Sequence, residues 1–246
     1  MAKTIIIVED NNDKYTFEAI IRHIHLSDNL LVQDTPDIDW EFVSAEKNAE
    51  EPTALIAGLK GLRNDIFKEK YDKIAIIQDI DFNSKENRLL LVNTAFKAAY
   101  SVEYQEITDT NILVPFSFIQ DDEGMEEPLT VHVACHFVGL TKNGIKQGEI
   151  EDILKAVKAQ PSPLADCIDE HLPECMKVSE EELRDKDLVK LWINNYQRYD
   201  PLQKKKRNYK ATQWENVMAK RATIFDFNRD EVADLKELKD FLLMMI

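Results

Sequence analysis

The 246-residue sequence predicts an α/β protein in which a mostly parallel sheet is flanked by helices. Short β-branched runs alternate with stretches in which apolar residues recur every three or four positions. That order is typical of parallel strands joined by crossover helices. The strand-like runs are apolar throughout, as in strands that are buried on both faces. Both observations point to the same fold class.

The first half of the chain alternates between predicted strands and helices. Residues 4–8 (Thr-Ile-Ile-Ile-Val) form a buried-strand pattern, followed by one apolar helix face: Phe17, Ile20, Ile21 and Ile24. Further elements are expected at 40–44 (strand), about 53–68 (helix) and 73–78 (strand). Ser84 is a candidate cap for the next helix, whose apolar face carries Leu89, Val92, Phe96 and Ala99.

The second half begins with two predicted strands and then becomes mostly helical. The strands cover 112–119 and 130–138, and the acidic loop 121–127 separates them. Helices are expected at 150–157, 163–175, 185–199, 209–220 and from about 230. We therefore predict an α/β core over residues 1–147 and a helical C-terminal portion over 148–246 that packs on the core.

Composition excludes several classes of protein. With 31 Lys and Arg against 46 Asp and Glu, the net charge of −15 argues against a protein that coats nucleic acid non-specifically. No apolar run approaches the length of a transmembrane helix, so we expect no membrane association. Three cysteines form an odd, sparse set without the pattern of a disulfide framework, which favours a cytoplasmic location.

Acidic residues stand where the predicted strands end. Glu9 follows the first strand, and Asp79 and Asp81 end the strand at 73–78. The carboxyl ends of parallel strands meet at one edge of a sheet, so these three side chains are expected to converge. Oxygen ligands of this kind suit Mg²⁺. Residues i and i+2 face the same way while the strand persists, which allows Asp79 and Asp81 to face one ion. The alternative is that these acids only form turns and helix caps.

Two families place acids in this pattern. The opening string Ile5-Ile6-Ile7-Val8-Glu9-Asp10-Asn11 resembles that of the phosphoacceptor receiver domain, which would make Asp79 the phosphorylated residue of a signalling module. The chain resembles the Toprim domain of topoisomerases, primases and OLD-type nucleases more fully. The matching motifs are Val8-Glu9 with Asp13 a few residues on, and the Asp-x-Asp of Asp79-Ile80-Asp81.

Three later segments narrow the resemblance to small Toprim-like bacterial and archaeal proteins related to OLD-type nucleases. These segments are Leu59-Lys60-Gly61-Leu62, Gly148-Glu149-Ile150-Glu151-Asp152 and Phe225-Asp226-Phe227. The resemblance covers most of the chain, and it implies a Rossmann-like Toprim core.

The resemblance also implies metal-dependent cleavage of phosphodiester bonds, as in a nuclease. Glu9 would correspond to the general acid or base, and Asp79 and Asp81 to the ligands of Mg²⁺ or Mn²⁺. Glu9 would also contact the metal, and a second metal would bring in Asp13 or Glu151. The alternative hypothesis is that the chain is a non-catalytic or signalling module that binds a metal ion but cleaves nothing.

One basic stretch stands out from the acidic chain. Residues 201–221 hold seven Lys and Arg and one acid, next to Tyr199, Tyr209 and Trp214. Basic and aromatic residues together are typical of proteins that grip nucleic acid strands, whereas a solvated loop is the simpler alternative. The predicted contact residues are Lys204, Lys205, Lys206, Arg207 and Lys210.

A zinc site at Cys135, His132 and His136 is disfavoured. Along a strand Cys135 and the two histidines face opposite ways, whereas zinc requires converging ligands.

Overall fold

The computed structural model describes residues 4–9, 11–27, 53–69, 71–100, 105–118, 129–179, 184–201, 213–219 and 224–245. The chain divides into two compact units. Unit 1 comprises Met1–Asp13, Leu31–Val138 and Asp240–Ile246, and unit 2 comprises Lys14–Leu30 and Gly139–Lys239. The division into 1–147 and 148–246 stays a prediction.

Unit 1 is built on a mixed sheet of four described strands in the order β1-β2-β4-β3. The strands are β1 (Thr4–Ile7), β2 (Lys73–Asp79), β3 (Val114–Phe118) and β4 (Leu129–Val138). β1 and β4 both run parallel to β2, whereas β3 pairs with β4 in the antiparallel direction. The predicted α/β class and mostly parallel sheet are therefore confirmed, with an antiparallel strand at one edge.

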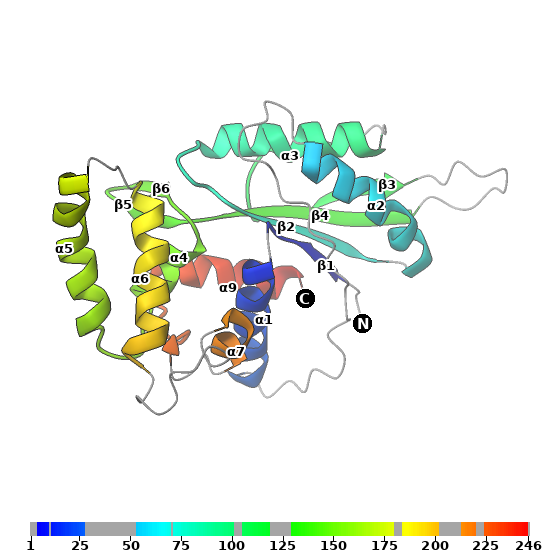
Figure 1. The fold of residues 1–246 in the computed structure, drawn as a ribbon. Coiled ribbons are helices and arrows are strands. Elements are labelled where there is room, and N and C mark those ends of the chain that lie inside the picture. The colour runs from blue at the N-terminus through cyan, green and yellow to red at the C-terminus, as the bar shows by residue number, and fades with distance from the viewer. Residues whose placement is uncertain are drawn as a thin grey trace. The chain divides into compact units, whose positions relative to one another are not determined.

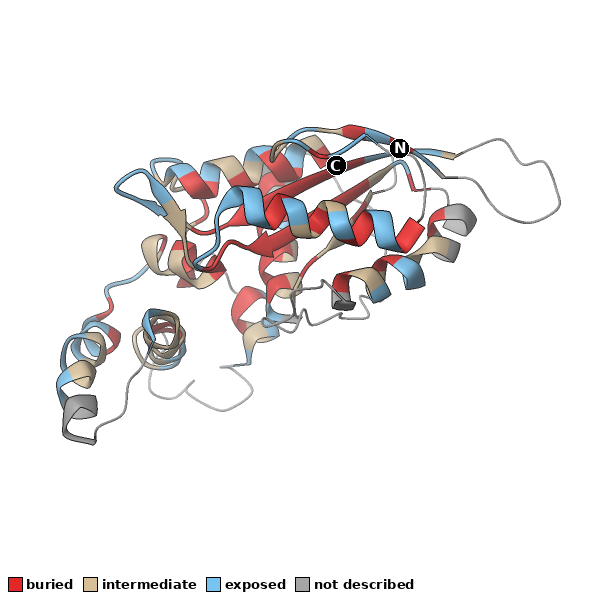
Figure 2. Cartoon of the chain, turned by 90° about the horizontal axis from the view of Figure 1, so that it is seen from above, coloured by how far each residue is buried: buried red, intermediate tan, exposed pale blue. Residues whose placement is uncertain are grey.

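Two helices cover one face of this sheet, α2 (Thr53–Glu69) and α3 (Lys85–Tyr100) (Figure 1). The Tyr100 hydroxyl donates a hydrogen bond to the Leu59 carbonyl, 2.7 Å away, and so joins the two helices. Ile76 of β2 and its register partner Cys135 of β4 both belong to the apolar core of this unit. The strands are largely buried, whereas the helices alternate between buried and exposed faces, as amphipathic helices do (Figure 2).

The last residues of the chain also belong to unit 1. The ring of Phe241 stacks on His136 of β4, with 5.2 Å between ring centroids. The Lys73 ammonium donates to the Met244 carbonyl at 2.7 Å, and the Thr4 hydroxyl donates to the Met245 carbonyl. The chain terminus therefore fastens the starts of β1 and β2.

Unit 2 is mainly helical. Its elements are most of α1 (Asn11–Ser27), β5 (Leu140–Lys142), β6 (Ile145–Gln147), α4 (Ile150–Ala156), α5 (Pro163–Ser179), α6 (Asp185–Tyr199), α7 (Trp214–Ala219) and most of α9 (Ala233–Met245). β5 and β6 form an antiparallel hairpin that the sequence analysis did not include. Asn143 and Gly144 turn this hairpin with φ of 53° and 80°, the backbone conformation that an Asn-Gly turn favours.

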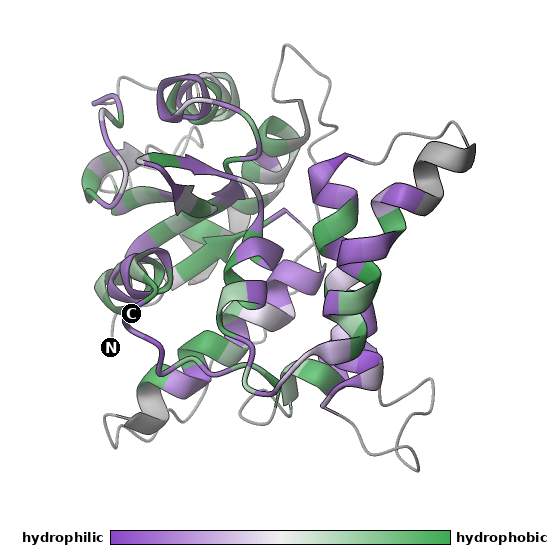
Figure 3. Cartoon of the chain, turned by 90° about the vertical axis from the view of Figure 1, so that its left-hand side faces the viewer, coloured by the Kyte–Doolittle hydropathy of each residue, from purple (hydrophilic) through white to green (hydrophobic). Residues whose placement is uncertain are grey.

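Aromatic side chains form the centre of unit 2. Trp192 and Tyr196 of α6 stack with 4.9 Å between centroids, and Phe225 packs against Tyr196. The Tyr196 hydroxyl donates to the Ile224 carbonyl at 2.7 Å and accepts a hydrogen bond from the Gln160 N–H. Figure 3 shows the helices carrying apolar and polar stripes side by side, as the sequence periodicity predicts.

Two of the predicted segments fall entirely outside the described residues, namely the strand at 40–44 and the acidic loop 121–127. No helix within the described part of the chain is long and apolar enough to cross a membrane.

Candidate functional site

The structure places the Glu9 carboxylate at the carboxyl end of β2. The Asp79 backbone N–H donates a hydrogen bond to Glu9 Oε1, with 3.1 Å between the two atoms. Seventy residues separate these positions in the sequence. They meet because β1 runs parallel and adjacent to β2, so the ends of both strands lie at the same sheet edge.

Asp79 is the last residue of β2 and only 7 % exposed. Its register partner is Val138, the last residue of β4, so Asp79 stands where two parallel strands end together. It follows Ile77 by two residues and shares the sheet face of that residue, opposite to the face of Ile76 and the helix-covered core.

Asp81 does not continue the strand. β2 ends at Asp79, and Asp81 has a φ of 53°, in the left-handed region that non-glycine residues seldom adopt. The alternation that would point Asp79 and Asp81 the same way therefore stops before Asp81. Its Oδ2 accepts a hydrogen bond from Arg88 Nη2 at 2.7 Å, and both side chains are almost fully buried.

These carboxylates fit a hard divalent cation in part. Glu9 and Asp79 supply the oxygen donors that Mg²⁺ and Mn²⁺ prefer, on a framework held by a backbone hydrogen bond. Asp81 commits one of its two oxygens to Arg88, so it offers at most one other oxygen. The donor chemistry of Glu9 and Asp79 thus suits the metal that the resemblance implies, and Arg88 competes for Asp81.

The two remaining predicted acids lie in helix N-terminal turns. Asp13 is on the first turn of α1 and is buried, within the first segment of unit 1. Glu151 is on the first turn of α4, in unit 2, together with Asp152. Acids in these positions compensate the helix dipole.

The segment Gly148–Asp152 has a local structural role at the start of α4. Gly148 has a φ of 90°, and a Cβ at this position would lie 2.2 Å from Asp152 Oδ2. The Glu149 N–H donates to that same oxygen at 3.2 Å. Glycine is therefore required for Asp152 to close over the helix start.

Glu149 was not predicted as a site residue, yet it is one of the most buried acids of unit 2. Its carboxylate lies 2.6 Å from Lys190 Nζ and 4.0 Å from Lys186 Nζ, both on α6. This ion pair ties α4 to α6. The two lysines lie four residues apart and so share one face of α6, but nothing in the sequence marks Glu149 as their partner.

The segment Phe225-Asp226-Phe227 also has a local role. Both phenylalanines are buried, and the Asp226 N–H donates to the Val157 carbonyl at 2.8 Å. Phe225 forms an isolated antiparallel bridge with Lys158. The motif therefore anchors the chain beside the end of α4.

Cys135 and His136 face opposite sides of β4, as predicted. Cys135 lies in the core under α2 and α3, where burial and, second, the charge of Asp109 raise the pKa of its thiol to about 12. His136 lies on the other side, against Phe241, and its Nδ1 is 2.8 Å from Asn111 Oδ1. This arrangement gives no support to zinc binding by these two residues.

The predicted nucleic-acid contact residues 204–207 and 210 lie outside the described residues. Comparisons of the chain with protein-family models, with curated proteins and with solved structures found no match.

Proposed function

We propose that this chain is a Mg²⁺- or Mn²⁺-dependent phosphodiester-cleaving protein of the Toprim type that acts on nucleic acid. The observation that carries the proposal is the 3.1 Å hydrogen bond from the Asp79 N–H to Glu9 Oε1. It joins the two acids of the first and second Toprim-like motifs at one sheet edge. Ligands of α/β sheets bind at that edge.

Each residue has a separate role in this proposal. Asp79 and Glu9 hold the cation, and Glu9 also moves the proton, as the general acid or base. Bound Mg²⁺ neutralises charge on a phosphate and lowers the pKa of a coordinated water. Asp81 contributes an oxygen ligand to the cation only when its carboxylate is not held by Arg88.

The proposal is tested with purified protein and labelled single-stranded and duplex DNA and RNA, in Mg²⁺, Mn²⁺ or EDTA. We expect cleavage that EDTA abolishes and that Glu9→Gln and Asp79→Asn each reduce at least about 100-fold, as expected for groups that act in the transition state. Glu231→Gln is the matched control, because this exposed acid of unit 2 pairs only with Arg229 among the ion pairs described. Glu151→Gln tests separately the sequence-based expectation that Glu151 contributes.

Two results would contradict the proposal. Cleavage that survives both Glu9→Gln and Asp79→Asn would show that these two residues do not carry the activity. An absence of cleavage, combined with phosphate incorporation at Asp79 from acetyl phosphate, would support the receiver-like signalling alternative.

Nucleic acid is the proposed partner through Lys204, Lys205, Lys206, Arg207 and Lys210. Replacing the four consecutive basic residues by alanine should weaken binding and flatten its salt dependence, because each lost phosphate contact lowers the slope by about 1. Binding with an unchanged salt slope would exclude this stretch as the contact surface.

A further inference from the structure

Phe82 is the one exposed phenylalanine among those whose side chains the structure describes. Its side chain is 65 % exposed, and it lies one residue after Asp81. The other phenylalanines with described side chains are all buried: Phe17, Phe96, Phe116, Phe137, Phe225, Phe227 and Phe241. Burial of a phenylalanine side chain adds about 1.5–3 kcal/mol to the unfolding free energy, and an exposed phenylalanine does not make this contribution.

The turn that carries Phe82 is held on both sides. Before it, the Ile80 N–H donates to the Val138 carbonyl at 2.7 Å, and Ile80 itself is buried. After it, the Asn83 N–H donates to the Ile80 carbonyl at 3.0 Å, and Ser84 Oγ accepts from the Asn87 N–H at 3.2 Å. The backbone of the turn that carries the ring is therefore fixed, and little further backbone ordering is needed when a ligand binds.

Phe82 also lies close to the proposed metal ligands. Three Cα–Cα steps of 3.8 Å place its Cα within about 11 Å of the Asp79 Cα. The Asp81–Arg88 ion pair further restrains this turn. This limit on the Cα–Cα distance allows an aromatic ring on the turn to meet a base whose phosphate Asp79 and Glu9 would engage through a cation.

We infer that Phe82 is a substrate-binding residue that stacks on an unpaired nucleobase, which makes single-stranded nucleic acid the substrate class. The inference rests on the proposed function and deepens it. Every base presents a π-face, so an aromatic platform binds without selecting sequence. A base in a duplex is already stacked on its neighbours, so the ring favours unpaired strands. Stacking on an aromatic ring is an uncharged contact. It therefore adds affinity for the nucleic acid beside Asp79 and Asp81 without a further metal ion to offset the negative charge of these residues.

The experiment measures binding of a 12-nucleotide single strand that carries 2-aminopurine, with Ca²⁺ in place of Mg²⁺. Phe82→Ala should weaken binding about 5- to 100-fold, the equivalent of one lost base stack. It should also abolish quenching of the 2-aminopurine fluorescence, whereas Phe82→Trp should restore both. Leu90→Ala is the matched control, because Leu90 on α3 is also 65 % exposed, and binding should stay within about twofold of the parent.

The outcomes separate this inference from the proposed function. Quenching that depends on Phe82, without any cleavage in Mg²⁺, supports the stacking role and contradicts the proposed nuclease. Metal-dependent cleavage with an unchanged KM in Phe82→Ala supports the nuclease and overturns the stacking role. Equal effects of Phe82→Ala on single strand and matching duplex, or no binding of the single strand to the parent protein, also overturn the inference.

Discussion

Arg88 near the start of α3 and Asp81 after β2 form a buried ion pair, with 2.7 Å between Nη2 and Oδ2. The pair joins the end of the central strand β2 to the helix that follows it. It also places a permanent cation against Asp81, one of the acids expected to bind a metal.

Breaking this pair should destabilise the protein. Arg88→Met leaves Asp81 charged and buried, which costs about 3–5 kcal/mol of unfolding free energy. Adding Asp81→Asn to Arg88→Met removes the isolated charge and should recover a large part of that loss. Urea denaturation of the parent, both single variants and the double variant measures the coupling, and strictly additive losses would contradict a direct interaction.

Metal affinity should depend on Glu9 and Asp79 more than on Asp81. Glu9→Gln and Asp79→Asn should each weaken Mn²⁺ binding at least about tenfold, or about 1.4 kcal/mol. Asp81→Asn should weaken it less than about threefold, because Arg88 already engages that carboxylate. Calorimetric titration of the apo protein provides the affinities, and a larger loss in Asp81→Asn than in Asp79→Asn would reverse this order.

Asp200 should stabilise the start of α5 from the end of α6. Its two carboxylate oxygens accept hydrogen bonds from the Leu164 N–H at 3.1 Å and the Ala165 N–H at 3.0 Å. Asp200→Ala should therefore lower the unfolding free energy by about 1 kcal/mol, as the loss of a helix cap does.

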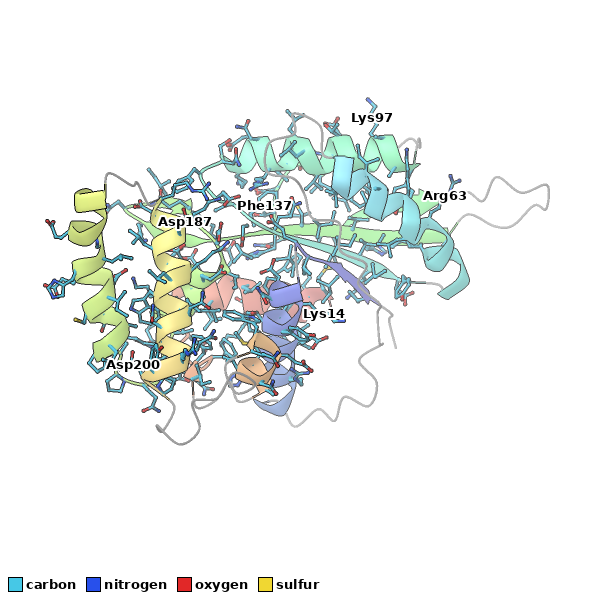
Figure 4. The ribbon with its side chains drawn as sticks, viewed as in Figure 1. Lys14, Arg63, Lys97, Phe137, Asp187 and Asp200 are labelled. Atoms are coloured by element: carbon cyan, nitrogen blue, oxygen red, sulfur yellow. The ribbon has the colours of Figure 1, made fainter. Side chains whose placement is uncertain are left out.

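The matched control is Asp187→Ala, near the opposite end of α6 (Figure 4). Asp187, in the first turn of α6, forms an exposed ion pair with Arg184, so its removal should lower the unfolding free energy much less than Asp200→Ala does. Equal shifts in both variants would indicate that Asp200 acts only through its charge.

Stability should fall in alkaline solution because of Cys135. Burial raises the pKa of this thiol from 9.0 to about 12, so between these values the unfolded chain loses the proton while the folded protein keeps it. The unfolding free energy is unaffected below pH 9 and then decreases by about 1.4 kcal/mol per pH unit. Cys135→Ala should flatten the decline between pH 9 and 11, measured by urea denaturation at each pH, and an unchanged slope would assign the loss to other groups.

The helices and the strands β1, β2 and β4 could be predicted from the sequence. Residues that face the core must be apolar, and this requirement gives helices and buried strands recognisable patterns of apolar residues. The apolar run before Asp79 became β2, and the spacing of Leu89, Val92 and Phe96 became the buried face of α3. The directions of β3 and β4 were not readable, because an apolar run looks the same in parallel and antiparallel pairs. The β5–β6 hairpin had a usable signal, the dipeptide Asn143-Gly144 between two short runs.

The approach of Glu9 to Asp79 followed from parallel-sheet topology, but the partner of Asp81 did not. Strand alternation predicts where a side chain points only while the backbone stays extended. The positive φ of Asp81 interrupts it. Arg88 then reaches Asp81 from the next helix, an arrangement set by three-dimensional packing and not by spacing alone.

The hydrogen bond from Thr4 to the Met245 carbonyl joins residues 241 positions apart. During synthesis, Thr4 of β1 leaves the ribosome 241 residues before Met245, its hydrogen-bond partner. Until Phe241 has been synthesised, His136 of β4 lacks its stacking partner, and the sheet face that carries His136 stays uncovered at that position. Because contacts of such long sequence separation form slowly, β1 and β2 stay without these contacts until the last turn of α9 has been synthesised, and that turn then completes this part of unit 1.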